Sequence, residues 1–331
     1  MIDLLTPLEL PGLTIPNRIF AAPVDGVFDQ PFRVILKRVG NVGLTSSELV
    51  SAAGLRWKSK VADRKIMRHE SERPFAVQLC DHDPALLVRA AVRLQEHGAC
   101  DLVDLNLGCP ARRTVSSRSG AALLLHPQDV KVIAREMRKV LKIPFTAKMR
   151  IGWDASQLNG VEIAKILEGE GVDLITVHGR TRAQAYSGTA DWNFIGLIKQ
   201  AVGIPVIANG DIVSFASARE ALRVSGADGV MIARACFGDP WALKRIHDGD
   251  DGFRPNDEEK LALILDHLQL HVEFFADEKF SVPAFRKHLL WYVKGLPGAK
   301  AFRDTAVRLQ TATEVADYLK VYLTTHFDSA K

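Results

Sequence analysis

The sequence predicts an α/β protein, a (β/α)8 TIM barrel followed by a small C-terminal helical bundle. Eight short apolar runs alternate with helical patterns between residues 19 and 235. The chain has 331 residues, which suits a barrel of about 250 residues and a second domain of roughly 80. Beyond residue 255 the apolar spacing becomes purely helical.

The eight apolar runs are the predicted barrel strands, because strands that alternate with helices form a parallel sheet. They cover residues 19–23, 42–46, 75–79, 102–106, 144–150, 174–178, 205–209 and 229–233. Helical patterns lie at 84–97, 127–141, 160–170, 192–202 and 215–225. So many repeats in so short a chain favour a closed barrel over an open sheet. A Pro-Gly turn inside residues 7–15 predicts a hairpin ahead of the barrel.

The domain organisation follows from the breaker-rich segment near residue 250. We assign residues 1–247 to the barrel, 248–255 to a linker and 256–331 to a helical bundle. The linker is rich in Asp and Gly, which favour turns. After it, apolar residues repeat at three-to-four spacing, as in the segment 261–272.

Composition excludes several classes of protein. The chain is 47% hydrophobic and 25% charged, which is typical of a globular protein and not of a disordered one. No apolar run approaches the roughly 18 residues that span a bilayer. The four cysteines are scattered without a CxxC pair, which argues against a disulfide framework and a zinc site. We therefore expect no metal, no membrane association and a cytoplasmic location.

The net charge is only +4, but its distribution is uneven. Residues 56–73 hold seven basic and three acidic side chains, and residues 279–308 hold seven basic and one acidic. Residues 248–278 hold ten acidic and two basic side chains. Most charged segments are simply solvated surface, yet such polarisation in a near-neutral chain favours an anionic partner.

Polar residues collect where the predicted strands end. Chemistry in TIM barrels lies at the C-terminal ends of the strands, all on one face. Packing alone does not explain a polar side chain at the top of nearly every strand. The residues at or near these ends are Pro23, Glu48, Gln78, Asn106, Cys109, Lys148, Arg150, His178, Arg180, Asn209, Asp211 and Arg234.

The last two strand ends indicate a phosphate site. Asn209-Gly210-Asp211 and Ala233-Arg234 follow strands seven and eight, the loops that hold phosphate in many barrels. A tight turn with an exposed Arg is the simpler alternative. A flavin held there by its phosphate would bring its ring to Lys148 and His178, and a lysine stabilises the charge of a reduced flavin. The alternative for Lys148 is an ion pair with a barrel carboxylate such as Asp104.

The loop after strand four carries a candidate reactive thiol. Cys109 follows Asn106 and Gly108, and three arginines at 112, 113 and 118 come next with no acid among them. A thiol beside these cations suggests a site that meets an anionic substrate. The alternative is a small buried hydrophobe, the common state of a free cysteine.

These segments resemble the tRNA-dihydrouridine synthases, flavin enzymes that reduce specific uridines in tRNA. The resemblance covers nearly the whole chain, and the combination of NxGCP, HGRTR and NGDI at barrel spacing is highly specific. The segments that carry it are 22–33, 47–51, 104–110, 148–153, 178–182, 209–212, 238–241 and, in the bundle, 286–292. The last of these resembles the family's helical tRNA-binding domain, so the resemblance implies that residues 1–247 form the FMN-binding catalytic domain and residues 256–331 the tRNA-binding domain.

The resemblance implies FMN as cofactor, NADPH as reductant and tRNA as substrate. It implies that Cys109 is the proton donor. The residues expected to hold FMN are Ala22, Pro23, Val24, Gln78, Lys148, His178, Asn209, Gly210, Asp211, Ala233 and Arg234. The residues expected to contact the substrate are Asn106, Glu48, Arg150, Arg180, Arg112, Arg286 and Lys287.

The expected reaction saturates the C5=C6 bond of uridine, with hydride from reduced FMN to C6 and a proton from Cys109 to C5. Two alternatives stay open. A dihydroorotate-dehydrogenase-like flavin oxidoreductase would use the same chemistry on a free small molecule, but it leaves the basic bundle unexplained. A catalytically silent RNA-binding barrel would not need Cys109, Lys148 or His178. We expect a monomer, because the bundle already covers part of the barrel.

Overall fold

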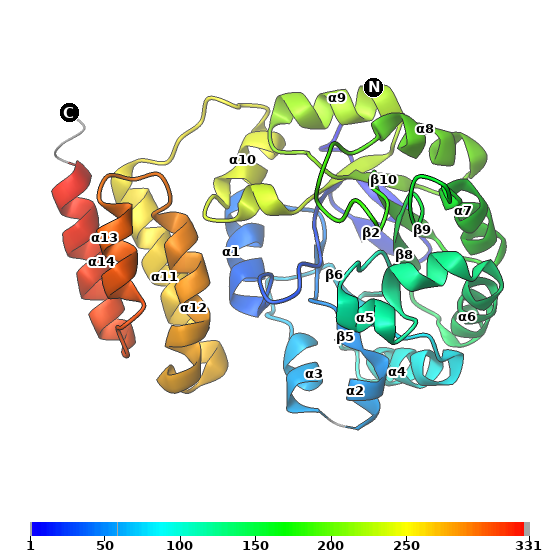
Figure 1. Ribbon diagram of the computed structural model, residues 1–331, viewed down its shortest axis with the longest axis horizontal. Helices are drawn as coiled ribbons and strands as arrows, with labels where there is room; N and C mark the ends of the chain where they lie inside the picture. The colour runs from blue at the N-terminus through cyan, green and yellow to red at the C-terminus, as the bar shows by residue number, and fades with distance from the viewer. Residues whose placement is uncertain (1, 58, 328–331) are drawn as a thin grey trace.

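The computed structural model describes residues 2–57 and 59–327, and its parallel strands close into the predicted barrel (Figure 1). The hydrogen-bonded order is β3-β11-β10-β9-β8-β7-β6-β4, and Ala21 N donates to Leu44 O to join the two ends. The TIM-barrel prediction is therefore confirmed. The barrel strands are β3 (Ile19–Ala21), β4 (Thr45–Ser46), β6 (Phe75–Cys80), β7 (Leu102–Leu107), β8 (Phe145–Arg150), β9 (Leu174–His178), β10 (Val206–Asn209) and β11 (Gly229–Ile232).

The second barrel strand is shorter than the predicted run 42–46. It consists of β4 (Thr45–Ser46), and a separate short strand, β5 (Val50–Ser51), pairs with β6 further along. Between the two lies Glu48, whose Oε1 accepts a hydrogen bond of 2.6 Å from Gly26 N. The carboxylate thus binds the loop after β3.

An N-terminal hairpin closes the bottom of the barrel. Its strands β1 (Leu8–Leu10) and β2 (Leu13–Ile15) pair antiparallel, as predicted. Their apolar side chains form one buried cluster with residues that begin barrel strands, including Leu102 and Leu174. Because this cluster fills the N-terminal end, the site must lie at the C-terminal end.

The barrel helices begin where polar side chains cap their first turns. Asp83, Asp191 and Ser214 accept hydrogen bonds from the first turns of α4, α8 and α9, so each predicted helix starts close to its expected position. The barrel helices are α1 (Gln30–Gly40), α4 (Pro84–Glu96), α6 (Pro127–Val140), α7 (Gly160–Gly169), α8 (Trp192–Ala201), α9 (Phe215–Ser225) and α10 (Trp241–Asp248). Shorter helices lie in the loops, namely α2 (Ala52–Arg56), α3 (Lys60–Lys65), α5 (Arg112–Ser116), η1 (Gly120–Leu125) and η2 (Arg234–Cys236).

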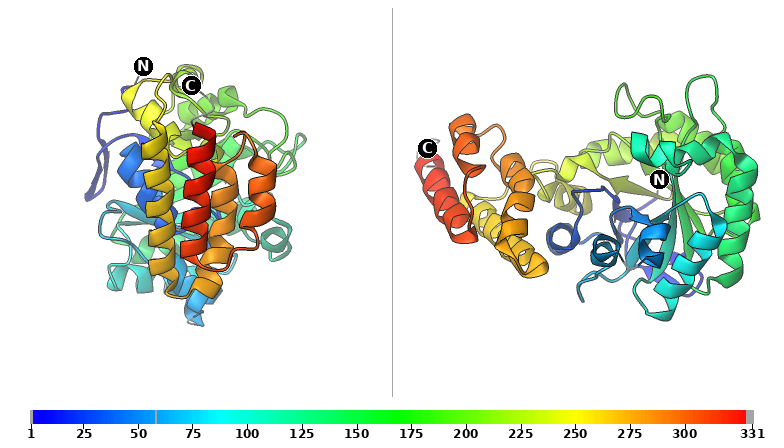
Figure 2. Two further views of the ribbon diagram at one scale, coloured as in Figure 1. Left: turned by 90° about the vertical axis from the view of Figure 1, so that its left-hand side faces the viewer. Right: turned by 60° about the horizontal axis from the view of Figure 1, so that its bottom comes forward.

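Four further helices form a bundle on one side of the barrel (Figures 1 and 2). They are α11 (Asp257–Phe275), α12 (Glu278–Tyr292), α13 (Ala299–Ala306) and α14 (Ala312–Phe327). The bundle has its own apolar core, which includes Phe285, Phe302 and Leu319. Helix α11 packs against α1 of the barrel. None of the described helices is both long and apolar enough to cross a membrane.

Candidate active site at the barrel mouth

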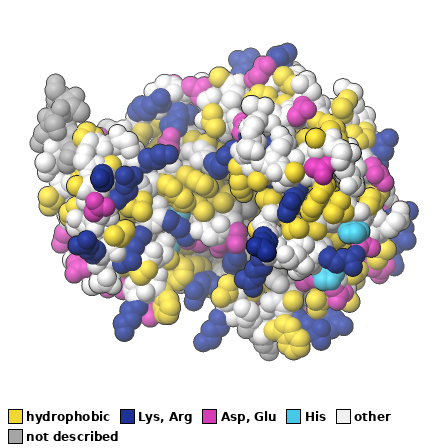
Figure 3. Space-filling view, in the orientation of Figure 1, with side chains coloured by type: hydrophobic (Ala, Val, Ile, Leu, Met, Phe, Trp, Pro, Cys, Tyr) yellow, Lys and Arg dark blue, Asp and Glu magenta, His cyan; other side chains and the backbone are white. Residues whose placement is uncertain are grey.

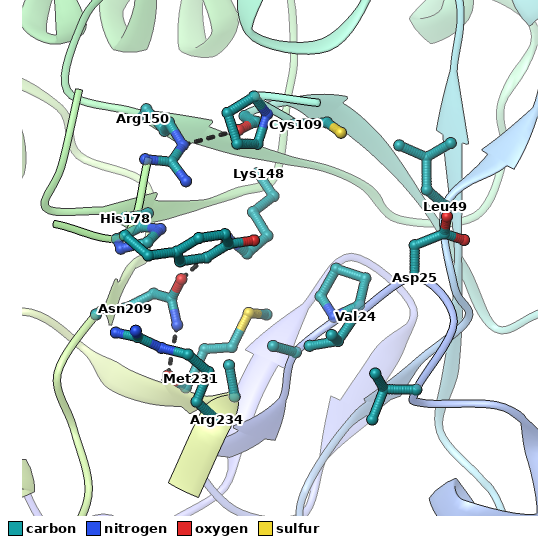
Figure 4. Close-up of a pocket in the computed structure, with 18 of the residues that line it drawn as sticks. Val24, Asp25, Leu49, Cys109, Lys148, Arg150, His178, Asn209, Met231 and Arg234 are labelled. Atoms are coloured by element: carbon teal, nitrogen blue, oxygen red, sulfur yellow. Dashed lines mark hydrogen bonds between the residues drawn. The ribbon is translucent and has the colours of Figure 1, made fainter. Parts of the chain in front are cut away.

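A cavity of about 780 Å³ opens at the C-terminal ends of the barrel strands (Figure 4). It is lined by side chains from strands that lie far apart in the sequence, so the barrel brings most of the predicted residues together. Those in the lining are Ala22, Pro23, Val24, Gln78, Asn106, Cys109, Lys148, Arg150, His178, Asn209, Gly210, Asp211, Ala233 and Arg234.

A chain of hydrogen bonds runs from the barrel interior to the backbone of Cys109. Gln78 Nε2 donates to Asp104 Oδ2 over 2.7 Å, and Asn106 Nδ2 donates to Gln78 Oε1 over 2.6 Å. Asn106 Oδ1 then accepts from the backbone N–H of Cys109 at 2.9 Å. Because Gln78 orients the Asn106 amide, its oxygen faces the backbone of Cys109. The chain thus sets the position of this residue in the cavity wall.

Cys109 is the only one of the four cysteines that is not buried. Its Sγ donates to Thr114 Oγ1 over 3.4 Å, on the short helix α5. Burial raises the pKa of Cys80 and of Cys100 to about 12, and it raises the pKa of Cys236 further. Those three thiols therefore stay protonated inside the core, and among the four cysteines Cys109 alone lines the cavity.

The cavity holds a cation beside a neutral imidazole. Lys148 Nζ donates to Asn209 Oδ1 over 3.0 Å, and Asn209 Nδ2 donates to the carbonyl of Met231 over 2.8 Å. Burial and the nearby Arg150 lower the pKa of Lys148 to about 8. Burial and the cations around it lower the pKa of His178 far below its usual range. At neutral pH this wall therefore presents a charged ammonium next to an uncharged ring.

The loop after β10 is tied to its neighbours by Asp211. Its Oδ2 accepts from Arg180 Nη2 at 2.7 Å and its Oδ1 accepts from Arg234 Nη2 at 3.2 Å. Gly210 has φ +109°, and a Cβ there would lie 2.8 Å from atoms of His178 and Ala190. Only glycine fits this close turn, which brings backbone to the cavity edge.

Arg150 anchors the loops above strand β8. Its Nε donates to Gly108 O at 2.9 Å, and its Nη1 donates to the carbonyls of Thr181 and Ala185 at 2.8 and 2.9 Å. The guanidinium carbon of Arg150 lies 5.8 Å from the centroid of the Tyr186 ring. One side chain thereby links the thiol loop to the loop after β9.

Five predicted substrate contacts lie outside the cavity lining of the described chain. Arg180 is only 2% exposed, and it donates to the carbonyls of Ser187 and Gly188 and to Asp211. The resemblance implies substrate contact for this residue, whereas its hydrogen bonds support the loop after β9. Glu48 lies beside the mouth, and burial raises the pKa of its carboxyl.

The remaining three are spread over two regions. Arg112 is exposed on α5, while its neighbour Arg113 reaches the lining. Arg286 donates to Leu309 O within the bundle at 2.8 Å, and Lys287 is half-buried on the same helix. Neither of these two basic residues belongs to the cavity lining, and Arg286 is engaged within the bundle.

Sequence reasoning missed several lining residues. Tyr186 and Met231 lie in the lining, as do Phe237 and, from the bundle, Trp291. Phe237 and Trp291 stack with ring centroids 4.6 Å apart. Methionine and aromatic residues carry no polar signal, and the contribution of α12 depends on how the bundle docks. Trp291 beside a basic cluster was the one available signal, and buried core is the more common place for such a residue.

Basic side chains surround the mouth. Figure 3 shows Lys and Arg on both sides of the hollow between bundle and barrel. At the end of α2, the guanidinium carbon of Arg56 lies 4.8 Å from the ring centroid of Trp57, a side chain that is 73% exposed. Lys58, counted in the same basic segment, lies outside the described residues.

A TIM barrel whose lower end is filled by an apolar cluster, and whose upper end holds a cavity lined by cations and one accessible thiol, has the architecture of a barrel enzyme. A family model described as dihydrouridine synthase matches residues 20–328, so the chain belongs to that family. The resemblance seen in the sequence is thereby confirmed.

Curated relatives extend over nearly the whole chain. A probable tRNA-dihydrouridine synthase of Rickettsia conorii is 38% identical over 330 residues, covering 98% of each chain. The tRNA-dihydrouridine synthase B of Pseudomonas aeruginosa is 39% identical over 305 residues, covering 90% of each. Among solved structures, a variant of NCR from Zymomonas mobilis matches with a TM-score of 0.56 and 16% identity, covering 78% of this chain and 95% of that one. That likeness concerns the fold alone.

Proposed function

We propose that this chain is a flavin-dependent tRNA-dihydrouridine synthase, which reduces the C5=C6 bond of uridines in tRNA. Family membership and the names of the relatives support the reaction class. The observation that carries the proposal is the hydrogen-bonded chain from Gln78 through Asn106 to Cys109, which positions one accessible thiol in the cavity wall.

FMN is the proposed cofactor, and the donor set of the cavity fits it. A volume of about 780 Å³ lies within the range of roughly 300–1,000 Å³ that small-molecule and cofactor sites occupy. Lys148 and His178 offer one charged and one neutral donor for the polar edge of a flavin ring. The close turn at Gly210 and the guanidinium of Arg234 suit a ribityl phosphate. NADPH is the proposed reductant.

Two groups would divide the reaction on the uracil between them. A reduced flavin, when bound, would supply a hydride for C6. The residue that would supply the proton is Cys109, from Sγ to C5, so that one hydride and one proton saturate the double bond. Asn106 holds the backbone at Cys109 in place during that transfer. Lys148 counters negative charge that develops nearby. The cysteine must then regain a proton from solvent, and its partial exposure allows this.

The tRNA substrate must present an unstacked base. Swinging a base out of folded RNA costs a few kcal/mol, and contacts between basic residues and phosphates offset this cost. Cations on both sides of the hollow are arranged for such contacts. Trp57, exposed beside Arg56, offers a stacking surface for a base.

The testing experiment is anaerobic. The purified protein is reduced, its flavin absorbance is followed, and unmodified tRNA transcript is added. We expect rapid reoxidation of the flavin by tRNA and none by orotate. Reoxidation by orotate alone would favour the dihydroorotate-dehydrogenase-like enzyme, and a protein that takes up no flavin would favour the silent RNA-binding barrel.

The role of Cys109 has its own test. General acid catalysis contributes about 10²–10⁴-fold, so Cys109→Ala should lose turnover by that factor while keeping its flavin. The matched control is Cys100→Ala, which removes a buried thiol outside the cavity. Turnover of Cys109→Ala equal to that of the control would overturn the assignment.

A further inference from the structure

A buried cluster of imidazoles joins the bundle to the barrel. His267 and His271 lie one turn apart on α11, and His288 lies on α12. They meet the carboxylate of Asp29, which caps the first turn of α1 by accepting from Phe32 N at 3.2 Å. The histidines are at most 1% exposed and Asp29 is 7% exposed. Polar groups are thus concentrated where two domains meet.

Several nitrogen atoms in the cluster have no hydrogen-bond partner among the described residues. These atoms are His267 Nε2, His271 Nδ1 and His288 Nε2. A buried polar atom without a partner costs about 1–3 kcal/mol, and three in one cluster call for an explanation. A ligand with strong affinity for imidazole nitrogen, bound at His267 Nε2 and His288 Nε2, would satisfy two of them.

The geometry suits a metal ion. One ligand atom each from Asp29, His267 and His288 lie within 4.8 Å of one another. Two ligands of one zinc ion, each at about 2.0–2.1 Å, lie roughly 3.4 Å apart in a tetrahedral site. Small side-chain rotations would therefore close the present triangle around an ion.

The neighbouring groups hold the proposed ligands in a binding orientation. His267 Nδ1 hydrogen-bonds with Tyr292 Oη at 3.0 Å, which leaves Nε2 facing the cluster. His271 Nε2 lies 3.2 Å from Asp29 Oδ2 and steadies the carboxylate. Metal-binding histidines usually make such an outer hydrogen bond through their second ring nitrogen.

The donor set itself suits a transition metal. Asp29 offers a carboxylate oxygen, and His267 and His288 each offer a ring nitrogen. Carboxylate oxygen and imidazole nitrogen are both ligands that zinc takes from proteins.

We propose that Asp29, His267 and His288 bind one Zn²⁺-type transition-metal ion, which fastens the bundle to the barrel. Two imidazoles and one carboxylate favour zinc and its neighbours over magnesium or calcium, which take oxygen ligands. The scattered cysteines led to an expectation of no metal, but that reasoning does not bear on an imidazole site. Asp29 precedes His267 by more than two hundred residues, so the proposed ligands do not form a short sequence motif that would indicate the site.

The test uses the full chain with any affinity tag removed and metals stripped by a chelator. Zn²⁺ is titrated calorimetrically, and Co²⁺ is followed by its visible absorption, which is intense in tetrahedral sites. We expect one equivalent of metal per chain and a higher melting temperature with Zn²⁺ than with chelator. Wild-type protein that binds less than a tenth of an equivalent while folded would overturn the proposal.

Three variants locate the metal. Asp29→Asn keeps the helix cap, because Asn caps as well as Asp, and it should weaken Zn²⁺ binding at least tenfold, as should His288→Gln. The matched control His82→Gln changes an exposed histidine outside the cluster and should bind as wild type does. Should His288→Gln not fold, Asp29→Asn decides alone. Wild-type affinity in folded Asp29→Asn would mean that Zn²⁺ binds elsewhere and would refute the site.

Discussion

Replacing Lys148 with methionine should stabilise the flavin-free protein at neutral pH while weakening flavin binding. The ammonium lies in the cavity wall, and burial, followed by Arg150, lowers its pKa from 10.5 to about 8. Below pH 8 the lysine is charged in both the folded and the unfolded chain. The folded state therefore carries the full cost of burying that charge, and an uncharged methionine side chain at this position would not carry it.

The magnitude follows from the displaced pKa. A shift of this size corresponds to about 3 kcal/mol without screening. Because Lys148 is only half-buried and the cavity is open to water, we expect about 1–2 kcal/mol. Losing the hydrogen bond to Asn209 costs about 1 kcal/mol at every pH.

The pH dependence separates the two contributions. Between pH of about 8 and 10.5 the unfolded chain binds more protons at this lysine than the folded chain does. The free energy of unfolding of the wild-type protein therefore increases as the pH rises through this range. The advantage of Lys148→Met should therefore shrink by about 1–2 kcal/mol between pH 7 and pH 10.

Urea unfolding of both proteins at the two pH values measures this change. The control Lys199→Met removes an ammonium that pairs with Asp228 at 2.7 Å outside the cavity lining, and it should destabilise the protein at pH 7. If the stability difference between Lys148→Met and wild type stays constant with pH, the argument from buried charge is refuted.

Three further outcomes are expected. Gln78→Leu leaves Asp104 and Asn106 without the hydrogen bonds that Gln78 makes to them, and it should lower the free energy of unfolding in urea by about 2–4 kcal/mol. Turnover should fall by a larger factor than flavin affinity does. Unchanged turnover would contradict the positioning role of Gln78. Glu72→Leu removes the carboxylate that pairs with the fully buried Arg33 and should lower the free energy of unfolding by about 3–5 kcal/mol. Glu220→Leu breaks an exposed ion pair and should lower it by less than about 1 kcal/mol. Equal losses of unfolding free energy in the two variants would contradict the argument from burial. Affinity for tRNA transcript should fall at least about tenfold between 50 and 200 mM salt, and a flat dependence in a filter-binding assay would exclude phosphate contacts as a main source of affinity.

The barrel was predictable because its signal is repeated. Each strand carries an apolar run, and several of the following helices begin at a residue such as Asp83, Asp191 or Ser214 that caps the first turn. The second strand was less predictable, since Glu48 binds Gly26 and the ladder is interrupted there. Local sequence patterns therefore predict hydrogen bonds between neighbouring residues well. They do not predict a contact between distant residues, such as that of Glu48 with Gly26.

The candidate site was predictable as a set of residues but not as a network. Strand ends indicated which polar side chains share the mouth. They did not show that Arg180 binds loop carbonyls, because that depends on the path of residues 187–188. Nor did they show that Gln78 bonds both Asp104 and Asn106, because strand register is needed to pair them.

The stacking of Trp291 on Phe237 has a consequence for anyone who recombines these enzymes. Trp291 belongs to the bundle and Phe237 to the barrel, and both line the cavity. A chimera that grafts a foreign bundle onto this barrel, in order to redirect it to another position in tRNA, would also rebuild a wall of the cavity. Residues 237 and 291 should therefore be taken from the same parent protein in such designs. Removing the bundle to obtain a minimal catalyst would open the cavity to water.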